Sequence, residues 1–401
     1  MSNAKYLSIF DEIKKKGGSI DGGEPNDKVL IIDGLNTFIR VFSVIPTTND
    51  DGIHVGGIVG FLRSIGYTIN MIRPTRTIVV FDGKGGSDRR RKIYPEYKAN
   101  RRTKKIRYNR VVNFDNIKDE RQNMMMQLSR ITNYLECLPL GVISIDNIEA
   151  DDSIAYLTTN VFKDSRISIM SSDKDFLQLV NDKVQVWSPT KKILYDRRKV
   201  EEEFGLLCEN MIYYRIVDGD KSDNIDGIRG YALKTILKKM PFLKNEMVSN
   251  IEDFIKKSGF NNHEELLVRN YILMQLSNVD ISGRAREKII NLVEGDLSRL
   301  VKYKIHKMFL EDKVNQAIRN PDVWLQDRSV LQHGERGPRD CVAKDDPITV
   351  SRRGDLRSSN ARLIHCFTPS SSSSPSSQES SAKKTSADSV GDSLRLMTVG
   401  K

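Results

Sequence analysis

Two acidic motifs constrain this chain more than any other feature, IEADD at 148–152 and SSDKD at 171–175. Each follows a short apolar run typical of a buried strand, 141–146 and 166–170, and each opens an expected helix. Carboxylates crowded at such a place repel one another by about 4 kcal/mol per close pair at an intermediate dielectric. A divalent cation would offset this repulsion, so the two motifs predict a metal site.

The surrounding sequence alternates strands with helices. Apolar runs at 28–33 and 77–82 predict two further strands, and helices are expected at 34–44, 55–72 and 120–138. This alternation predicts an α/β fold with a parallel sheet between helices, in which ligands bind at the carboxyl ends of the strands. Asp33 and Asp82 end the first two strands, so we expect carboxylates at all four strand ends.

Each acid taken alone has a simpler explanation. An Asp or Glu in the first turn of a helix is favoured by capping and by the helix dipole, and for Asp152 or Asp173 singly this is the better one. Capping does not predict acids at every strand end while Lys and Arg are absent from the same positions. Jointly, the pattern favours a metal site.

The segment 84–110 is strongly basic. It holds twelve Lys or Arg residues against two acids, and thus supplies ten of the eleven excess positive charges of the chain. A solvated charge run or a nuclear-import signal would be the simpler interpretation. However, the segment leaves a strand that ends in Asp82, and Tyr94, Tyr97 and Tyr108 are interleaved with its charges. Basic groups follow phosphates while tyrosines stack on unpaired bases, so we favour a nucleic-acid clamp.

Composition sets further limits. The chain has 401 residues, 38% of them hydrophobic, and a sequence pI of about 9.3, which favours an anionic partner. No apolar run of membrane-spanning length and no export signal is present, so a cytoplasmic protein is expected, in a bacterial host if it is a phage protein. The four cysteines lie far apart and the five histidines do not cluster, which argues against zinc and against imidazole catalysis.

Downstream of residue 190 the pattern becomes helical. Glycines at 227 and 230 precede a basic helix, an arrangement that can present backbone N–H groups to phosphate, although an ordinary helix connection is the simpler interpretation. From about residue 326 the sequence turns rich in Ser, Arg and Asp without periodicity, which predicts disorder.

Six motifs occur in order along the chain: IIDGLN (31–36), FDG (81–83), PEYKANR (95–101), IEADD (148–152), SSDKDF (171–176) and GDKSDNIDGIRG (219–230). Together they resemble the 5′-nuclease superfamily of flap endonucleases and 5′→3′ exonucleases over about residues 28–240. T-even-phage RNase H and stand-alone phage 5′→3′ exonucleases look most similar, because no polymerase is fused.

The resemblance implies a PIN-like catalytic domain (28–200) with a basic arch or clamp (84–110), and a helical DNA-binding subdomain with a helix–hairpin–helix (201–327). An N-terminal extension (1–27) and a disordered tail (328–401) lie outside it. It also implies two magnesium ions, with manganese as a substitute, and in the family the hairpin can hold a potassium ion. One departure is Ala232, where the hairpin usually has its final glycine.

Residue roles follow from the motif positions. The resemblance assigns Lys98 and Arg101 to the scissile phosphate and Tyr97 to base stacking. It implies metal ligands or neighbouring acids at Asp33, Asp82, Glu149, Asp151, Asp152, Asp173, Asp175, Asp220 and Asp223. It implies nucleic-acid contacts at Arg91, Tyr97, Lys98, Arg101, Arg102, Gly227, Gly230 and Lys234.

The expected function is metal-dependent hydrolysis of phosphodiesters near 5′ ends of DNA, and of RNA in RNA–DNA hybrids, for primer or flap removal in DNA replication. Expected partners are DNA with 5′ flaps or nicks, a single-strand-binding protein and a sliding clamp, with a monomeric enzyme and no membrane. Two alternatives stay open: a PIN-type ribonuclease on free RNA, and a non-catalytic nucleic-acid-binding protein.

Overall fold

The computed structural model describes residues 26–103, 107–295, 297, 299–314, 317–318, 321–322 and 325, without the side chains of 102 and 103. Most of the N-terminal extension and the whole predicted disordered tail lie outside these residues, so both stay predictions.

The centre of the fold is a six-stranded sheet in the order β3-β2-β1-β4-β5-β6. The first five strands are parallel, and β6 runs antiparallel to β5. The strands are β1 (Lys28–Asp33), β2 (Arg76–Phe81), β3 (Gly141–Ser144), β4 (Arg166–Met170), β5 (Val184–Ser188) and β6 (Ile193–Tyr195). The predicted α/β class with a mostly parallel sheet is therefore confirmed.

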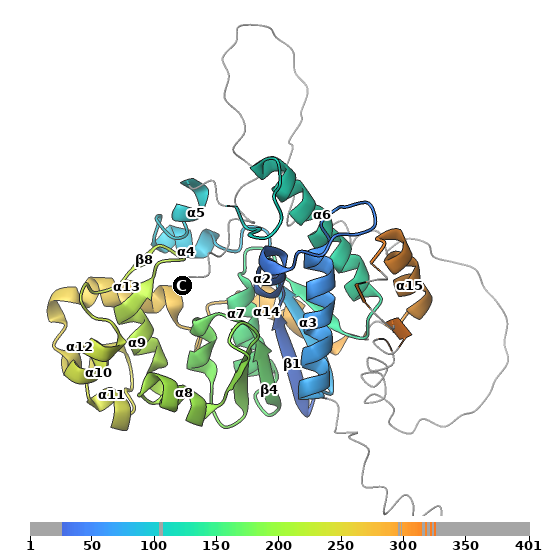
Figure 1. Ribbon diagram of the computed structural model, residues 1–401. Coiled ribbons are helices and arrows are strands. Elements are labelled where there is room, and N and C mark those ends of the chain that lie inside the picture. Colours follow the sequence, from blue (N-terminus) through green and yellow to red (C-terminus); the bar gives the residue numbers. More distant parts are fainter. Residues whose placement is uncertain are drawn as a thin grey trace, which may run out of the picture.

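Helices cover both faces of this sheet (Figure 1). In β1, Leu30 and Ile32 belong to one core cluster while Val29 and Ile31 belong to the other, as expected for a central strand buried on both sides. The cluster around Leu30 is completed by α2 (Gly34–Val44), α3 (Gly56–Ile72), α6 (Ile117–Glu136) and α15 (Lys302–Glu311). On the other face lie α7 (Ala150–Tyr156), η1 (Leu157–Val161) and α14 (Gly283–Glu294), and the helices between β6 and α14 continue the same core cluster.

The helices between β6 and α14 pack beside the sheet (Figure 1). They are α8 (Arg197–Phe204), η3 (Cys208–Asn210), α9 (Met211–Asp218), α10 (Leu233–Lys239), α11 (Phe242–Asn245), α12 (Ile251–Ser258), η4 (Asn261–His263) and α13 (Glu264–Met274). A two-stranded ribbon of β7 (Gly219–Asp220) and β8 (Ile225–Asp226) lies between α9 and α10. The division into a catalytic domain and a DNA-binding subdomain stays a prediction.

Two expectations differ in detail. The basic segment 84–110 contains two short helices among its described residues, α4 (Asp88–Ile93) and α5 (Asn100–Thr103). The helix expected from Asp173 is a 3₁₀ helix, η2 (Lys174–Leu179), which Asp173 caps through its side chain. Within the described ranges, no helix has the length and apolarity that crossing a bilayer requires.

Candidate active site

The sheet places acids from β1 and β2 beside the start of α7. Asp33, the last residue of β1, accepts hydrogen bonds from the Asn36 backbone N–H (3.1 Å) and from the Ser171 hydroxyl (2.9 Å). Asp82, directly after β2, accepts one from the Ala150 backbone N–H (2.7 Å). The predicted meeting of acidic strand ends therefore occurs in the structure.

Gly83 makes this approach possible. A Cβ at this position would lie 1.7 Å from the carbonyl oxygen of Ile145, closer than any side chain can come. The loop after β2 therefore presses directly on the backbone that leads into α7, and Asp82 is brought beside Glu149.

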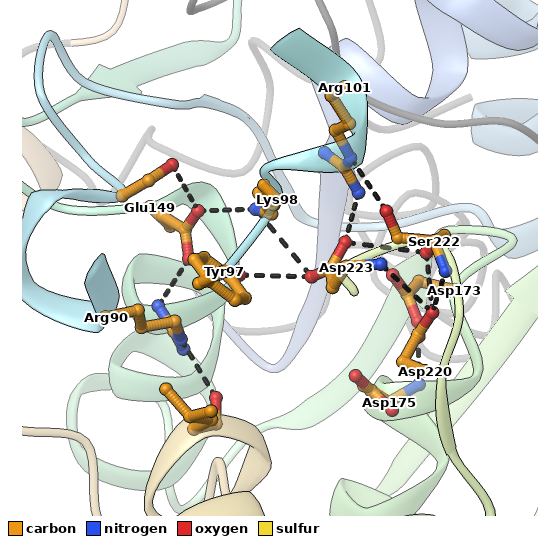
Figure 2. A network of polar contacts seen from close by, with 12 residues as sticks. Arg90, Tyr97, Lys98, Arg101, Glu149, Asp173, Asp175, Asp220, Ser222 and Asp223 are labelled. Atoms are coloured by element: carbon orange, nitrogen blue, oxygen red, sulfur yellow. Dashed lines mark hydrogen bonds and ion pairs between the residues drawn. The ribbon is translucent and has the colours of Figure 1, made fainter. Parts of the chain in front are cut away.

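Glu149 lies at the centre of a buried ionic network (Figure 2). One of its carboxylate oxygens lies 2.5 Å from Lys98 Nζ and accepts a hydrogen bond from Ser87, and the other lies 2.6 Å from Arg90 Nη1. Burial by itself would raise the pKa of Glu149, but Lys98 and Arg90 hold that pKa well below its usual range. Glu149 is therefore a carboxylate whose charge is already compensated by the protein.

Four other acids have no Lys or Arg side chain in contact in the described structure, although the charge of Lys98 lowers the pKa of Asp33, Asp82 and Asp151 from a greater distance. Within the described residues, no ion pair forms at Asp33, Asp82, Asp151 or Asp173. Burial and the charge of Asp82 raise the pKa of Asp33 to about 7, although two hydrogen bonds partly oppose this. Burial, together with Asp175 and Asp220, raises the pKa of Asp173 to about 8. The pKa values of Asp82 and Asp151 are also raised by burial, and that of Asp151 by Asp173 and Asp33 as well.

Buried and half-buried carboxylates that repel one another and have no ion-pair partner fit hard divalent cations, which bind oxygen ligands. Asp151, Asp175 and Asp223 line one small pocket. Among the described residues, no three Asp, Glu, His or Cys side chains yet form a ready-made ion site. The donor set therefore fits divalent cations by its chemistry, while Lys and Arg side chains occupy part of the space among the acids.

A second acidic group follows β4 and α9 (Figure 2). Arg215 of α9 joins two of its members, with Nε 2.6 Å from Asp175 and Nη2 2.8 Å from Asp220. Asp223 pairs with Arg101 and lies 3.8 Å from Lys98 Nζ. Lys98 thus stands between the two acidic groups, in contact with Glu149 on one side and near Asp223 on the other.

The basic segment is fixed to the site. Tyr97, Lys98 and Arg101 are all buried, and the Lys98 backbone N–H donates to the Asp223 carbonyl at 2.8 Å. Lys98 also has a φ of 58°, a left-handed conformation that a non-glycine residue adopts only where its surroundings impose it. The Tyr97 hydroxyl lies 3.0 Å from both Glu149 and Asp223, so the ring would have to leave this position to stack on a base.

Asp152 takes a different direction from its neighbours. Arg90 binds it through two nitrogens, at 2.8 Å each, and donates from Nε to the Leu273 carbonyl of α13 at 2.9 Å. Asp152 thus neutralises part of the charge of Arg90, and Arg90 also pairs with Glu149, so one arginine links the two acids.

Arg90 and Arg215 are the buried residues that sequence reasoning did not single out. Arg90 was one of many basic residues in its segment. A usable signal existed for Arg215, because it is a lone cation within an apolar helix, and such a residue needs an acidic partner.

The remaining predicted contacts lie at the periphery. Gly230 has a φ of 83° and open space around it, and Lys234 is exposed on α10. A Cβ at Gly227 would lie 2.3 Å from the Asp218 carbonyl oxygen, so this glycine allows close backbone packing. Arg91 lies 3.6 Å from Asp88, and the side chain of Arg102 is outside the described residues.

Comparison with known proteins agrees with this fold. Residues 28–205 match the family model of the 5′-3′ exonuclease N-terminal resolvase-like domain. A 5′-3′ exonuclease of Aquifex aeolicus is 29% identical over 294 residues, 72% of this chain and 94% of that protein. DNA polymerase I of Bacillus subtilis is 29% identical over 217 residues, but only 23% of that polymerase is covered. A T5 5′-exonuclease structure with bound zinc ions has the same fold, with a TM-score of 0.51, 22% identity, and coverage of 77% of this chain and all of that one.

Proposed function

Because the chain belongs to the 5′-nuclease superfamily, a group of phosphodiester hydrolases, we propose that it is a metal-dependent 5′→3′ exonuclease and flap endonuclease. Its substrates would be DNA with 5′ flaps or nicks and the RNA strand of RNA–DNA hybrids. The names of the relatives, 5′-3′ exonuclease and DNA polymerase I, support a role in removing primers or flaps during DNA replication.

One observation carries this proposal: buried and half-buried acids from separate strand ends, which have no ion-pair partner, lie close to Lys98 and Arg101 of the basic segment. Acids alone would suit a cation-binding protein, and basic residues alone would suit a nucleic-acid binder. A hydrolase of phosphodiesters needs both within reach of one phosphate.

Two divalent cations, magnesium with manganese as a substitute, would occupy this site. Asp33, Asp82, Glu149 and Asp151 would hold the first cation, and Asp173, Asp175 and Asp223 the second, with Asp151 between them. Bound there, such cations lower the pKa of a water nucleophile and neutralise charge on the attacking and leaving oxygens.

The protein's own cations orient the substrate. Lys98 and Arg101, which contact Glu149 and Asp223 in this structure, would turn to oxygens of the scissile phosphate. This exchange is balanced, because the carboxylates that lose a Lys or Arg partner gain a metal cation. The exposed Lys234 next to Gly230 would contact a duplex phosphate.

A cleavage assay tests the proposal. The full chain would be given a 5′-flap duplex, an RNA–DNA hybrid and single-stranded RNA, each with Mg²⁺ or with EDTA. We expect cleavage of the first two substrates only, with 5′-phosphate products, and no cleavage in EDTA or by Asp173→Asn. Asp196→Asn is the matched control, because Asp196 also caps a helix but lies outside the site.

The other outcomes separate the alternatives. Preferred cleavage of single-stranded RNA would favour a PIN-type ribonuclease. Binding of all substrates without cleavage would favour a non-catalytic protein, and cleavage in EDTA would refute the metal mechanism.

A further inference from the structure

The carboxyl end of α13 has backbone carbonyls that its own helix cannot satisfy. In any helix, the C=O groups of the last turn lack N–H partners within the helix. Here two side chains from distant segments supply the donors: Arg90 Nε donates to the Leu273 carbonyl at 2.9 Å, and Gln178 Nε2 donates to the Met274 carbonyl at 3.0 Å. One helix end therefore contacts both the basic segment and the 3₁₀ helix that follows β4.

Gln178 uses its whole side-chain amide in this arrangement. Its Nε2 also donates to the Asp175 carbonyl at 2.8 Å, and its Oε1 accepts a hydrogen bond from the Leu276 backbone N–H at 2.9 Å. An amide has two hydrogens to donate, and both are used here together with the oxygen. The backbone of η2 at Asp175 is therefore held against the end of α13 through one side chain.

α13 is also fixed to the ribbon of β7 and β8. Asn270 of α13 is fully buried and donates from Nδ2 to the Ile216 carbonyl at 2.9 Å and to the Asp226 carbonyl at 2.8 Å. Asp226 belongs to the ribbon, which carries Asp220 in β7 and Asp223 in its turn. α13 therefore joins the two segments that supply the second acidic group, the ribbon through Asn270 and η2 through Gln178.

The hydrogen bonds of Gln178 differ in kind from the contact that Arg215 makes with Asp175. Arg215 contacts the Asp175 carboxylate at 2.6 Å, so a cation bound to that carboxylate would compete with this contact. Gln178 contacts the backbone of Asp175 and does not involve the carboxylate. Its hydrogen bonds therefore persist when the carboxylate turns to a cation.

We propose that Gln178 is a positioning residue that sets the place of Asp173 and Asp175 relative to Asp223, an inference that rests on the proposed two-metal function. Groups that lie behind a metal ligand fix the orientation of that ligand, and their loss typically weakens metal binding by about 10- to 100-fold. Gln178 acts only through the acids that it positions, because its amide is fully occupied by backbone groups.

Manganese binding to the metal-free, full-length protein tests this without a nuclease reaction. Gln178→Met keeps the length of the side chain but removes all three hydrogen bonds. In a calorimetric titration it should weaken the binding of at least one Mn²⁺ ion by about tenfold or more. The same variant should need a correspondingly higher Mg²⁺ concentration for half-maximal flap cleavage.

Gln127→Met is the matched control, because it makes the same substitution at another amide that joins two segments. Gln127 of α6 donates to the His54 carbonyl at 2.8 Å and accepts a hydrogen bond from the Ile58 backbone N–H at 3.0 Å, where α6 meets the start of α3. This variant should lower the free energy of unfolding in urea but leave the Mn²⁺ affinity within about threefold of wild type. If Gln178→Met is too unstable without metal, it can be purified with Mn²⁺ and its affinity measured by competition with a chelator.

An unchanged Mn²⁺ affinity in Gln178→Met would overturn the inference. An equal loss of affinity in Gln127→Met would also overturn it, because the effect would then reflect a general loosening of the fold. Both results would leave the proposed nuclease function intact. Absence of any Mn²⁺ binding by the wild-type protein would instead refute the proposed metal mechanism, and this inference with it.

Discussion

Asp173→Asn should stabilise the metal-free protein while it abolishes cleavage. Asp173 is half-buried next to Asp175 and Asp220, and no ion pair forms at its carboxylate in the described structure. Its Oδ1 accepts a hydrogen bond from the Asp175 backbone N–H at 2.8 Å, which caps η2, and an asparagine oxygen can accept the same bond. The substitution therefore removes a charge that costs stability and keeps the cap.

The magnitude follows from the pKa of Asp173, which rises from 3.8 to about 8. The folded chain keeps this proton to a higher pH than the unfolded chain, so folding stability falls as pH rises from about 4 to about 8. At pH 7, ionising Asp173 in the folded chain would lower the free energy of unfolding by about 4 kcal/mol, at roughly 1.4 kcal/mol per pH unit above 3.8. The charges of Asp151 and Asp175 contribute to the same mutual repulsion, so removing one charge relieves only part of it. We therefore expect Asp173→Asn to raise the free energy of unfolding by about 2 kcal/mol at pH 7.

Urea unfolding in EDTA at pH 5, 7 and 8.5 measures this effect. The gain of Asp173→Asn over wild type should be below about 1 kcal/mol at pH 5 and should grow toward pH 8.5. Added Mg²⁺ should reverse the order, because only the wild-type protein regains full ligation. Asp196→Asn, at another helix cap, should show no comparable gain at any pH. A substitution at Asp173 that destabilises the metal-free protein, or acts equally at pH 5 and 8.5, would refute the reasoning.

Three further predictions concern other parts of the site. Arg90→Met should lower the free energy of unfolding by about 3–5 kcal/mol, since it leaves buried acids unpaired, and Asp152→Asn in the same chain should recover part of the loss in urea unfolding. Lys98→Ala should reduce flap cleavage by about 100-fold or more in single-turnover assays while duplex binding changes little; an unchanged rate would remove Lys98 from the site. Gly219→Ala should cost more than about 2 kcal/mol, because φ is 75° and the new Cβ would lie 2.4 Å from a backbone nitrogen, whereas Gly259→Ala, with φ 72° and open space, should cost about 1 kcal/mol in the same measurement.

Strand-end acids could be predicted because the parallel sheet has a simple rule. Apolar runs of strand length fixed where β1 and β2 end, and their carboxyl ends must share one edge of the sheet. Asp33 and Asp82 therefore came together as expected, from positions far apart in the sequence.

Partner choice within the site could not be predicted in this way. Asp152 follows Asp151 directly, and only the helical direction of α7 decides that it meets Arg90. The burial of Tyr97 and Lys98 depends on a left-handed turn pinned to the Asp223 carbonyl, a long-range contact without a sequence signal. The pattern of charges along the sequence predicted which residue types meet at the site. Which acid pairs with which Lys or Arg depends on packing between distant segments.

Tyr97 places a single proton between the two acidic groups. Its hydroxyl has equal 3.0 Å approaches to Glu149 and Asp223, yet a hydroxyl carries only one hydrogen to donate. Whichever carboxylate receives this hydrogen is the better stabilised, and the other must rely on its Lys or Arg partner. A cation bound to Glu149 would leave the hydroxyl hydrogen of Tyr97 free to be donated to Asp223. Ion binding at one acidic group would then change the hydrogen bonding of the other through the Tyr97 hydroxyl.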